Sequence, residues 1–179
     1  MTLLLWIYVL STQSVFAQTL ETDRGYQIKA NMLYHFSQFV EWPNNASIQN
    51  SDIFVIAVLG NDPFGAVLDS TLAGRTIHGK TLIIRRYTSV EEVQDVDLVF
   101  LGASKDGRLK EDLDHLRRRH ILTVGESSRF SQHGGIIRFL EIKNNVRFEI
   151  NREAASLAGL GLSSQLLVLA ITTKSIRSS

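Results

Sequence analysis

The chain has 179 residues, of which 44% are hydrophobic, and its formal net charge is +1, from 19 basic and 18 acidic residues. This length and composition suit one ordinary domain with a buried core. The near-neutral charge gives no field that would attract nucleic acid, so we expect no nucleic-acid partner. The sequence contains no cysteine, which excludes disulfides, thiolate catalysis and zinc–cysteine sites within the chain.

The N-terminus has the pattern of an export signal. An apolar run from Leu3 to Leu10 is followed by a polar interval and then by Val15-Phe16-Ala17, which ends in the small residue that signal peptidase prefers. We therefore expect residues 1–17 to be a signal peptide and residues 18–25 to be a flexible N-terminus, which places the protein in the periplasm. An uncleaved membrane anchor is the competing interpretation, but the run is far shorter than the roughly 20 apolar residues that span a bilayer.

A first helix is predicted from about Arg24 to Glu41. Apolar residues recur there at helical spacing, and Pro43 forbids continuation of the helix. The candidate partner or dimer interface on this helix consists of Met32, Phe36, Phe39 and Trp42. Together these four side chains carry more apolar surface than a helix on the outside of a small domain normally exposes to water. Two interpretations stay open: the helix packs on its own sheet, or it packs partly against a second chain.

Strands and helices alternate through the middle of the chain. Strands are predicted at Ile53–Leu59, Leu82–Tyr87, Leu98–Leu101 and Ile121–Val124. A helix is predicted from Pro63 through Leu72, and a second helix from about Ser104 to Arg119. This alternation is typical of βαβ units and predicts an α/β fold, with a mainly parallel Rossmann or flavodoxin-like sheet flanked by helices.

The C-terminal part is predicted to add an antiparallel hairpin and a helical tail. Ile136 to Lys143 and Val146 to Ile150 have the composition of strands, joined by a type I′ turn at Asn144-Asn145. Asn151 and Ser163 are predicted to cap two short helices. The expected domain covers residues 26–172 and leaves a tail of residues 173–179.

One loop is a candidate ligand site. Its candidate residues are Asn61, Asp62, Phe64 and Gly65. The loop leaves the carboxyl end of the first parallel strand, where open α/β sheets bind ligands. The dinucleotide fingerprint is not present, because Asp62-Pro63 stands where glycine would let the backbone approach a phosphate. The alternative interpretation is that Asp62 caps the following helix and Gly65 serves packing.

The sequence offers no catalytic constellation. Its five histidines lack the spacing of metal ligands, and no G-x-S-x-G occurs. His115 and His120 are expected to be solvated residues at the end of a helix, beside three arginines that complement the helix dipole. We therefore predict no catalytic residues, no metal site and no cofactor.

Several segments resemble the YfiR-like family in their order and spacing. The similar segments are Lys29-Ala30 through Phe36, Phe39 to Pro43, Leu59 to Gly65, Leu122 to Glu126, and Gly134 to Ala170. Together they span roughly Tyr26 to Thr172. The family consists of small bacterial periplasmic proteins, of which the best-understood kind represses a membrane-bound diguanylate cyclase.

The resemblance implies a non-enzymatic regulatory protein that binds the periplasmic sensor region of an inner-membrane diguanylate cyclase. Repression of that cyclase would lower cyclic-di-GMP and biofilm formation, and a homodimer is expected. YfiR-like domains also occur attached to sensor kinases, so the alternative is a small-ligand-sensing module that acts on another membrane receptor. This sequence departs from some relatives in lacking cysteine, so redox control through a thiol cannot operate in it.

Overall fold

The computed structural model describes residues 23–43, 51–102 and 107–171. The predicted signal peptide, residues 18–22 and the tail of residues 173–179 lie outside this part. Residues 23–25, which were expected to belong to a flexible N-terminus, are helical and begin the first helix, residues 23–39. Within the described part, no helix has both the length and the apolar character needed to cross a bilayer.

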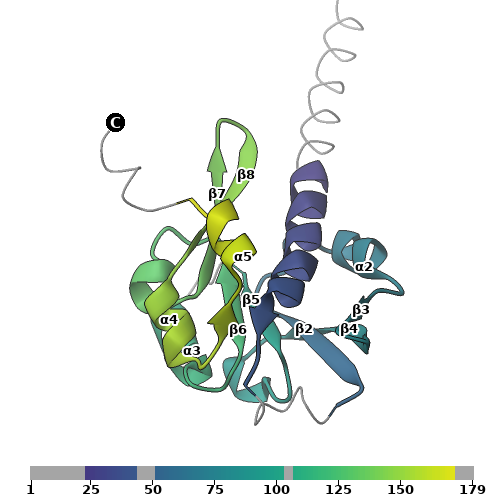
Figure 1. The fold of residues 1–179 in the computed structure, drawn as a ribbon, viewed down its shortest axis with the longest axis horizontal. Helices are drawn as coiled ribbons and strands as arrows, with labels where there is room; N and C mark the ends of the chain where they lie inside the picture. Colours follow the sequence, from purple (N-terminus) through teal and green to yellow (C-terminus); the bar gives the residue numbers. More distant parts are fainter. Residues whose placement is uncertain (1–22, 44–50, 103–106, 172–179) are drawn as a thin grey trace, which may run out of the picture.

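A seven-stranded sheet forms the centre of the molecule (Figure 1). Its strands in spatial order are β3 (Thr76–Ile77), β4 (Lys80–Tyr87), β2 (Ile53–Leu59), β5 (Leu98–Leu101), β6 (Leu122–Gly125), β7 (Ile137–Ile142) and β8 (Asn145–Ile150). The five inner strands are parallel, and β3 and β8 run antiparallel at the two edges. The order β4-β2-β5-β6-β7 is that of a flavodoxin-like sheet. The predicted α/β fold class is confirmed.

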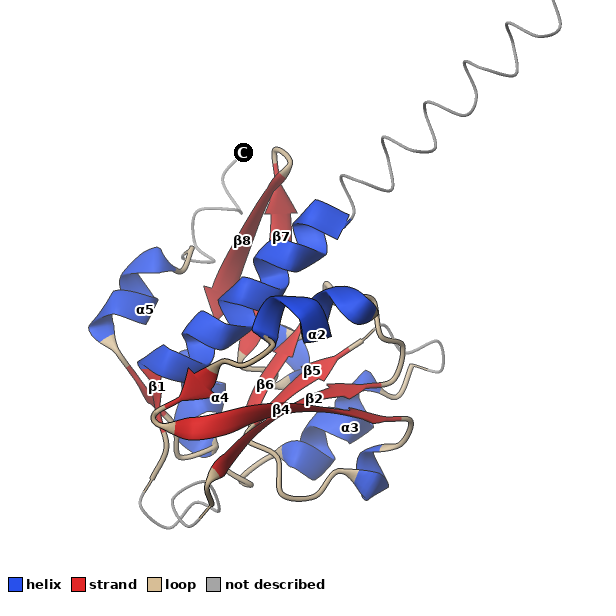
Figure 2. Cartoon of the chain, turned by 90° about the vertical axis from the view of Figure 1, so that its right-hand side faces the viewer, coloured by secondary structure: helices blue, strands red, loops and turns tan. Residues whose placement is uncertain are grey.

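Helices cover both faces of the sheet (Figure 2). The first helix, α2 (Ala66–Leu72), α4 (Arg152–Leu157) and α5 (Ser164–Leu169) contribute buried residues to the core on one face. The other face is covered by α3 (Leu109–Leu116) and by the 3₁₀ turn η2 (Val90–Glu92). Because both faces are covered, β2 consists almost entirely of apolar residues, as a strand buried on both sides requires.

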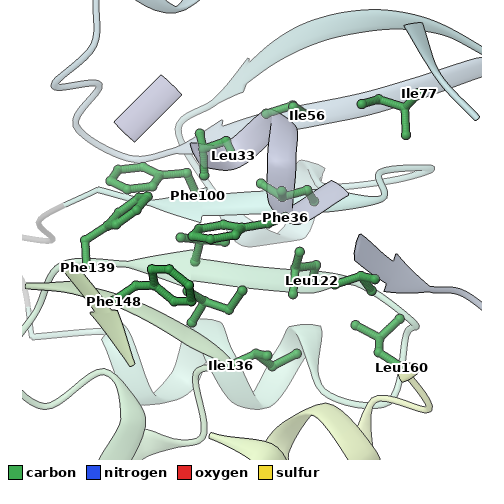
Figure 3. Packing of buried hydrophobic residues seen from close by; sticks show 14 of the residues in the cluster. Leu33, Phe36, Ile56, Ile77, Phe100, Leu122, Ile136, Phe139, Phe148 and Leu160 are labelled. Atoms are coloured by element: carbon green, nitrogen blue, oxygen red, sulfur yellow. The ribbon is translucent and has the colours of Figure 1, made fainter. Parts of the chain in front are cut away.

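Aromatic side chains fill the larger core between the first helix and the sheet (Figure 3). The ring of Phe36 lies 4.8 Å from that of Phe148 and 5.7 Å from that of Phe139, between ring centroids. Phe100 continues this group toward Phe64, at a centroid distance of 4.8 Å. Burying each such side chain contributes about 1.5–3 kcal/mol, so this cluster is a main source of stability.

The smaller core on the opposite face depends on two glycines that admit one ring. Phe130 is 0% exposed, and its ring lies where a Cβ on Gly125 or Gly135 would stand, at 2.3 and 2.1 Å from such an atom. Any other residue at either position would force the ring away. Phe130 thereby fixes the segment that carries the 3₁₀ turn η3 (Ser131–His133) to the sheet.

The first helix ends earlier than predicted. Residues 23–39 are helical, whereas Val40–Glu41 form a short strand, β1, that pairs antiparallel with β9 (Gly161–Leu162). The terminal carbonyls of the helix have distant partners: the Ser163 N–H donates to the Phe39 carbonyl at 3.1 Å, and His78 Nε2 lies 3.2 Å from the Ser37 carbonyl. These contacts replace the next helical turn, and apolar periodicity along the chain could not reveal them.

The predicted helix from Ser104 to Arg119 extends past the end of the observed helix, and its residues 104–106 lie outside the described residues. In the described residues α3 covers only Leu109–Leu116. Arg118 and His120 adopt positive φ, 62° and 57°, which ends helical structure. The interpretation of His120 as a solvated helix residue was therefore wrong: its Nδ1 lies 2.8 Å from the Ala158 carbonyl, in a contact between two loops.

The C-terminal hairpin forms with a different turn. Lys143 and Asn144, with φ of 50° and 60°, are the two central residues of the turn, so β8 already begins at Asn145. The register aligns Ile142 with Asn145. Strand β7 pairs antiparallel with β8, as predicted for the hairpin, and parallel with β6, so the hairpin places one antiparallel strand, β8, at this edge of the sheet.

Both predicted helix caps are confirmed. The side chain of Asn151 accepts a hydrogen bond from the Ala154 N–H, and that of Ser163 from the Leu166 N–H. Each cap satisfies one of the amide groups that the first turn of a helix leaves without a partner. Helix α2, in contrast, begins at Ala66 and not at Pro63, with Gly65 at its N-cap position.

Asp97 is a buried carboxyl group at the amino end of β5. It is 5% exposed, and its Oδ2 accepts a hydrogen bond from the Val55 N–H at 2.7 Å, which joins the starts of β2 and β5. Burial raises the pKa of Asp97 from 3.8 to about 6, against the opposing effects of this hydrogen bond and of the charge of Lys80. The charged carboxylate is therefore less favourable in the folded chain than in water.

We predict that Asp97→Asn changes how stability depends on pH. Because the folded-state pKa is raised, the native state binds more protons than the unfolded state from about pH 4 to about pH 6, and wild-type stability falls as pH rises through this window. The amide keeps an acceptor for the Val55 N–H but does not titrate. Urea unfolding should show the variant gaining about 2 kcal/mol relative to wild type between acidic and neutral pH. An equal pH dependence of the two proteins would contradict this account.

Candidate functional site

The predicted ligand loop follows β2 and enters α2, at the carboxyl edge of the parallel strands. Asp62 Oδ1 accepts hydrogen bonds from the Phe64 N–H at 2.8 Å and the Gly65 N–H at 3.3 Å. These bonds form an Asx turn that leads the chain into α2. The alternative interpretation, in which Asp62 caps α2, is wrong, because Gly65 holds the N-cap position and no side chain caps this helix. Asp62 instead holds the loop ahead of α2.

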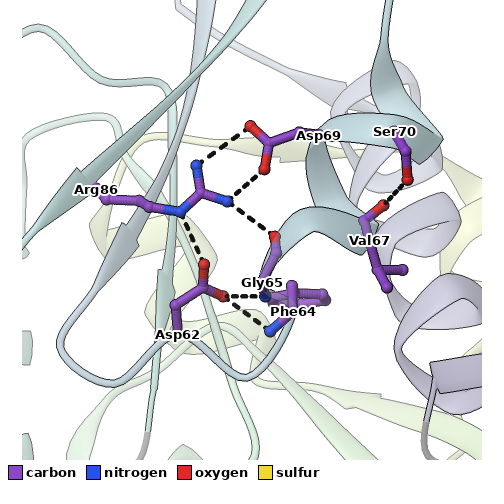
Figure 4. A network of polar contacts seen from close by, with 7 residues as sticks. All are labelled: Asp62, Phe64, Gly65, Val67, Asp69, Ser70 and Arg86. Carbon is purple, nitrogen blue, oxygen red and sulfur yellow. Dashed lines mark hydrogen bonds and ion pairs between the residues drawn. The ribbon is translucent and has the colours of Figure 1, made fainter.

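An arginine from the neighbouring strand holds the same loop (Figure 4). Arg86 Nε lies 2.8 Å from Asp62 Oδ2, Arg86 Nη1 donates to Asp69 Oδ1 at 3.2 Å, and Arg86 Nη2 donates to the Gly65 carbonyl at 3.0 Å. The hydrogen bond from Arg86 lowers the pKa of Asp69, and the two carboxylates raise the pKa of Arg86. The guanidinium group thus joins β4, the loop and α2.

The inner side of the loop is filled by its own residues. Phe64 is 3% exposed and packs edge-on against Tyr26, at a centroid distance of 5.3 Å. A Cβ on Gly102 would lie 1.8 Å from the Asn61 carbonyl oxygen, so the loops after β2 and β5 touch at the point where the strand order reverses. Of the four candidate residues, Asn61 and Gly65 are exposed, Asp62 is half-buried and Phe64 belongs to the core. A ligand role for this loop stays a prediction.

The four residues of the candidate interface on the first helix divide into two groups. Phe36 is 2% exposed and Trp42 is 8% exposed, so both lie in the core of the chain itself, and Trp42 Nε1 donates to the His120 carbonyl at 2.9 Å. Met32 and Phe39 are partly buried and pack against the rim of that core. The geometry leaves only Met32 and Phe39 within reach of a second chain.

The most exposed apolar side chains in the described residues lie on α5, which was not among the predicted interface residues. Val168 is 83% exposed and Leu169 is 65% exposed. We call these two residues the α5 surface. The sequence contains a pattern that indicates this exposure. Residues 166–169 are four consecutive apolar residues, which point to all sides of a helix and cannot all face one core. Leu166 is the residue that fills the core, at 1% exposed.

The N-terminal end of α5 adjoins the end of the first helix. Ser163, the N-cap residue of α5, donates its backbone N–H to the carbonyl of Phe39, the last residue of the first helix. Beyond the other end of α5, the Ile171 N–H donates to the Phe148 carbonyl of the edge strand β8 at 2.9 Å. Helix α5 is thus placed between the first helix and the edge strand.

A charged group links the first helix to the carboxyl end of β6. Lys29 Nζ lies 3.1 Å from Glu126 Oε1 and 4.3 Å from the centre of the Tyr26 ring. Burial raises the pKa of Tyr26, and the charges of Glu126 and Glu141 act in the same direction. The ion pair between Lys29 and Glu126 thus joins the first helix to the end of β6. Its charges are paired within the chain, which favours a structural role.

A second buried ion pair joins the two strands of the hairpin. Arg138 and Glu149 are cross-strand partners, and Arg138 Nε lies 2.9 Å from Glu149 Oε1 without the alignment of a hydrogen bond. Ser131 Oγ donates to the same carboxylate at 2.7 Å, which ties the hairpin to η3. Glu149 Oε2 has no hydrogen-bond partner among the described residues. Breaking such a buried pair is costly, so these residues hold the hairpin in register.

The basic run after α3 is also engaged within the chain. Arg117 Nη2 lies 2.8 Å from Asp114 Oδ1, and Arg119 Nη2 donates to the Val93 carbonyl at 2.9 Å. Because of these contacts, Arg117 and Arg119 are less available to a partner than three consecutive arginines in a sequence would suggest. In residues 23–43, 51–102 and 107–171, no group of three or more His, Cys, Asp or Glu side chains is arranged to hold a metal ion.

Comparison with known families assigns the chain. The model of the YfiR/HmsC-like family matches residues 26–171, which include the sheet and every helix that flanks it. The chain belongs to the YfiR/HmsC-like family. No curated protein matches it in sequence. The predicted family is confirmed, and membership in the YfiR/HmsC-like family indicates a periplasmic regulatory protein of diguanylate cyclase signalling.

We predict that Asp62 acts mainly through its hydrogen bonds to the loop. Asp62→Ala removes the acceptor of the Asx turn and the ion pair with Arg86, whereas Asp62→Asn keeps the acceptor and removes only the charge. The alanine variant should lose about 1–2 kcal/mol of stability in urea unfolding, and the asparagine variant less than half of that. Equal stability of both variants and wild type would show that the turn does not depend on Asp62.

Proposed function

We propose that this protein is a non-enzymatic repressor that binds the periplasmic sensor region of an inner-membrane diguanylate cyclase and holds that enzyme inactive. The consequence in the cell is less cyclic-di-GMP and less biofilm. The observation that carries the proposal is the family match over residues 26–171. The exposed apolar residues Val168 and Leu169 are consistent with a function that depends on contact with another protein.

The α5 surface is the part of the molecule that best suits contact with the cyclase. Monomeric proteins usually bury large aliphatic side chains, and an exposed pair beside a partly buried aromatic residue is typical of an interaction site. Val168 and Leu169 supply the apolar anchor, and Phe39 lies at the adjoining end of the first helix. Met32 extends this candidate face along the helix, where a homodimer contact is the second use that we propose.

Repression requires a difference in affinity between two states of the cyclase. A protein that binds the inactive and active states equally well shifts nothing, however tightly it binds. About 1.4 kcal/mol of preference for the inactive state changes the ratio of states tenfold. An apolar contact of a few side chains can supply a preference of this size if the cyclase presents its matching surface only in the inactive state.

The proposal is tested by deleting the gene and measuring cellular cyclic-di-GMP. Deletion should raise the cyclic-di-GMP level, and complementation should lower it only when the complementing chain carries a working export signal. Unchanged cyclic-di-GMP in the deletion strain would overturn the repressor and favour a ligand-sensing module that acts on another membrane receptor. Reversal by a chain without the export signal would overturn the periplasmic site of action.

We predict that the double variant Val168→Asp, Leu169→Asp loses repression while staying folded. Both side chains are largely exposed, so their replacement should change the free energy of unfolding by less than about 1 kcal/mol. The matched control is Ile142→Asp, Leu157→Asp, which places the same two charges on residues that are 38% and 45% exposed and lie outside α5. Complementation of the deletion strain by the control but not by the double variant supports the α5 surface. Full repression by the double variant would exclude it.

A further inference from the structure

Residues 161–171 are attached to the rest of the chain by few contacts. Strand β9 pairs only with the two residues of β1, outside the main sheet. Ser163 and Ile171 each donate one backbone hydrogen bond, to Phe39 and Phe148. Leu166 is the one fully buried side chain of the segment, while Val168 and Leu169 face solvent. The segment therefore adds little to the core that the sheet and the other helices form.

The chain is firmly held just before this segment. Gly159 has a φ of 72°, a conformation that residues with a side chain rarely adopt, and a Cβ there would lie 2.9 Å from His120 Nδ1. The Gly159 N–H donates to the Ser156 carbonyl at 2.9 Å and the Leu160 N–H to the Ala155 carbonyl at 3.0 Å, and Leu160 is 5% exposed. The chain is thus fixed up to Leu160 and can change direction only beyond it.

The free energy of opening a segment depends on what that segment buries. Short helices are marginal in water, and α5 has six residues, so its stability comes from contacts with its neighbours. Those contacts amount to a two-residue ladder, two further backbone hydrogen bonds, one buried leucine and the partly buried side chains of Leu162 and Ala170. Their sum is well below the stability of a whole domain, whereas β2 and β5 exchange their amides only when the core unfolds.

We propose that residues 161–171 form a strap that opens as one unit beyond Leu160 while the sheet stays folded, and that this opening separates the α5 surface from the end of the first helix. In the closed state, the strap holds Val168 and Leu169 at a fixed position relative to Phe39. In the open state, the strap releases the Phe39 carbonyl, the outer edge of Val40–Glu41 and the Phe148 carbonyl. The opening of the strap is a property of the chain alone and does not rest on the proposed cyclase partner.

Hydrogen exchange of the purified protein tests the opening. The amides of Ser163 and Ile171 should exchange at least about tenfold faster than the amides of β2 and β5, with a rate that low urea concentrations leave unchanged. Exchange of the strap amides at the rate and with the urea dependence of the core amides would overturn the proposal, because the segment would then open only with the whole domain.

An engineered disulfide tests whether the strap moves as one unit, and the chain suits it because it has no cysteine of its own. Val40 and Leu162 are directly opposite in the β1–β9 ladder. The hydrogen bond from Ser163 to Phe39 makes Val40 and Leu162 a non-hydrogen-bonded pair, whose close Cα atoms permit a disulfide. In the oxidised Val40→Cys, Leu162→Cys variant, exchange at Ile171 should slow at least about tenfold relative to the reduced form, although Ile171 lies at the far end of the strap.

The matched control is Thr76→Cys, Thr81→Cys in the β3–β4 hairpin, an antiparallel pair of the same geometry outside the strap. Oxidation of this control should leave the exchange of Ser163 and Ile171 unchanged. If oxidation at residues 40 and 162 slows Ser163 but not Ile171, the segment frays in pieces and the single strap is excluded. If both disulfides slow the strap amides equally, the effect comes from global stability and the proposal fails.

Discussion

The packing of the first helix on the sheet is the constraint on which the rest of the structure depends. Its buried face supplies Leu33 and Phe36 to the core, where Phe36 meets aromatic rings from both strands of the C-terminal hairpin. The end of the helix is held by partners from three distant segments, namely His78, Ser163 and the His120 loop through Trp42. If this helix shifted, β1, β9 and α5 would lose the contacts that fix their positions.

The two candidate regions differ in how their polar groups are used. In the loop after β2, Asp62 and Arg86 already satisfy each other and the backbone, and Phe64 closes the inner side. A ligand would have to compete with these contacts. The α5 surface carries no such internal partners, since Val168 and Leu169 face solvent. Burying them against another molecule is favourable without breaking anything within the chain. For this reason, binding of another protein at the α5 surface fits the molecule better than binding of a small ligand at the loop after β2.

The buried charged groups serve the architecture. Arg138 and Glu149 tie the two hairpin strands to η3, and Asp97 ties the starts of β2 and β5 together. Each has its contacts inside the chain. Such pairs contribute little net stability but oppose alternative registers, because a slipped strand would leave a charge buried alone. They keep the hairpin, and through Phe148 the end of α5, at a defined position.

By itself, the sequence determined the features that depend on neighbouring residues. The apolar run of β2, the alternation in β8 and the caps Asn151 and Ser163 are local patterns, and they were sufficient for the fold class and the family. Element ends were less predictable. The first helix stops at residue 39, where segments far along the chain bond to its last carbonyls, and α3 ends at Leu116, where the backbone of Arg117 leaves the helical region. Likewise, only the tertiary structure decided that Phe36 and Trp42 lie inside while Val168 and Leu169 lie outside. All four are apolar residues in or beside helices, and their exposure depends on which neighbours cover them.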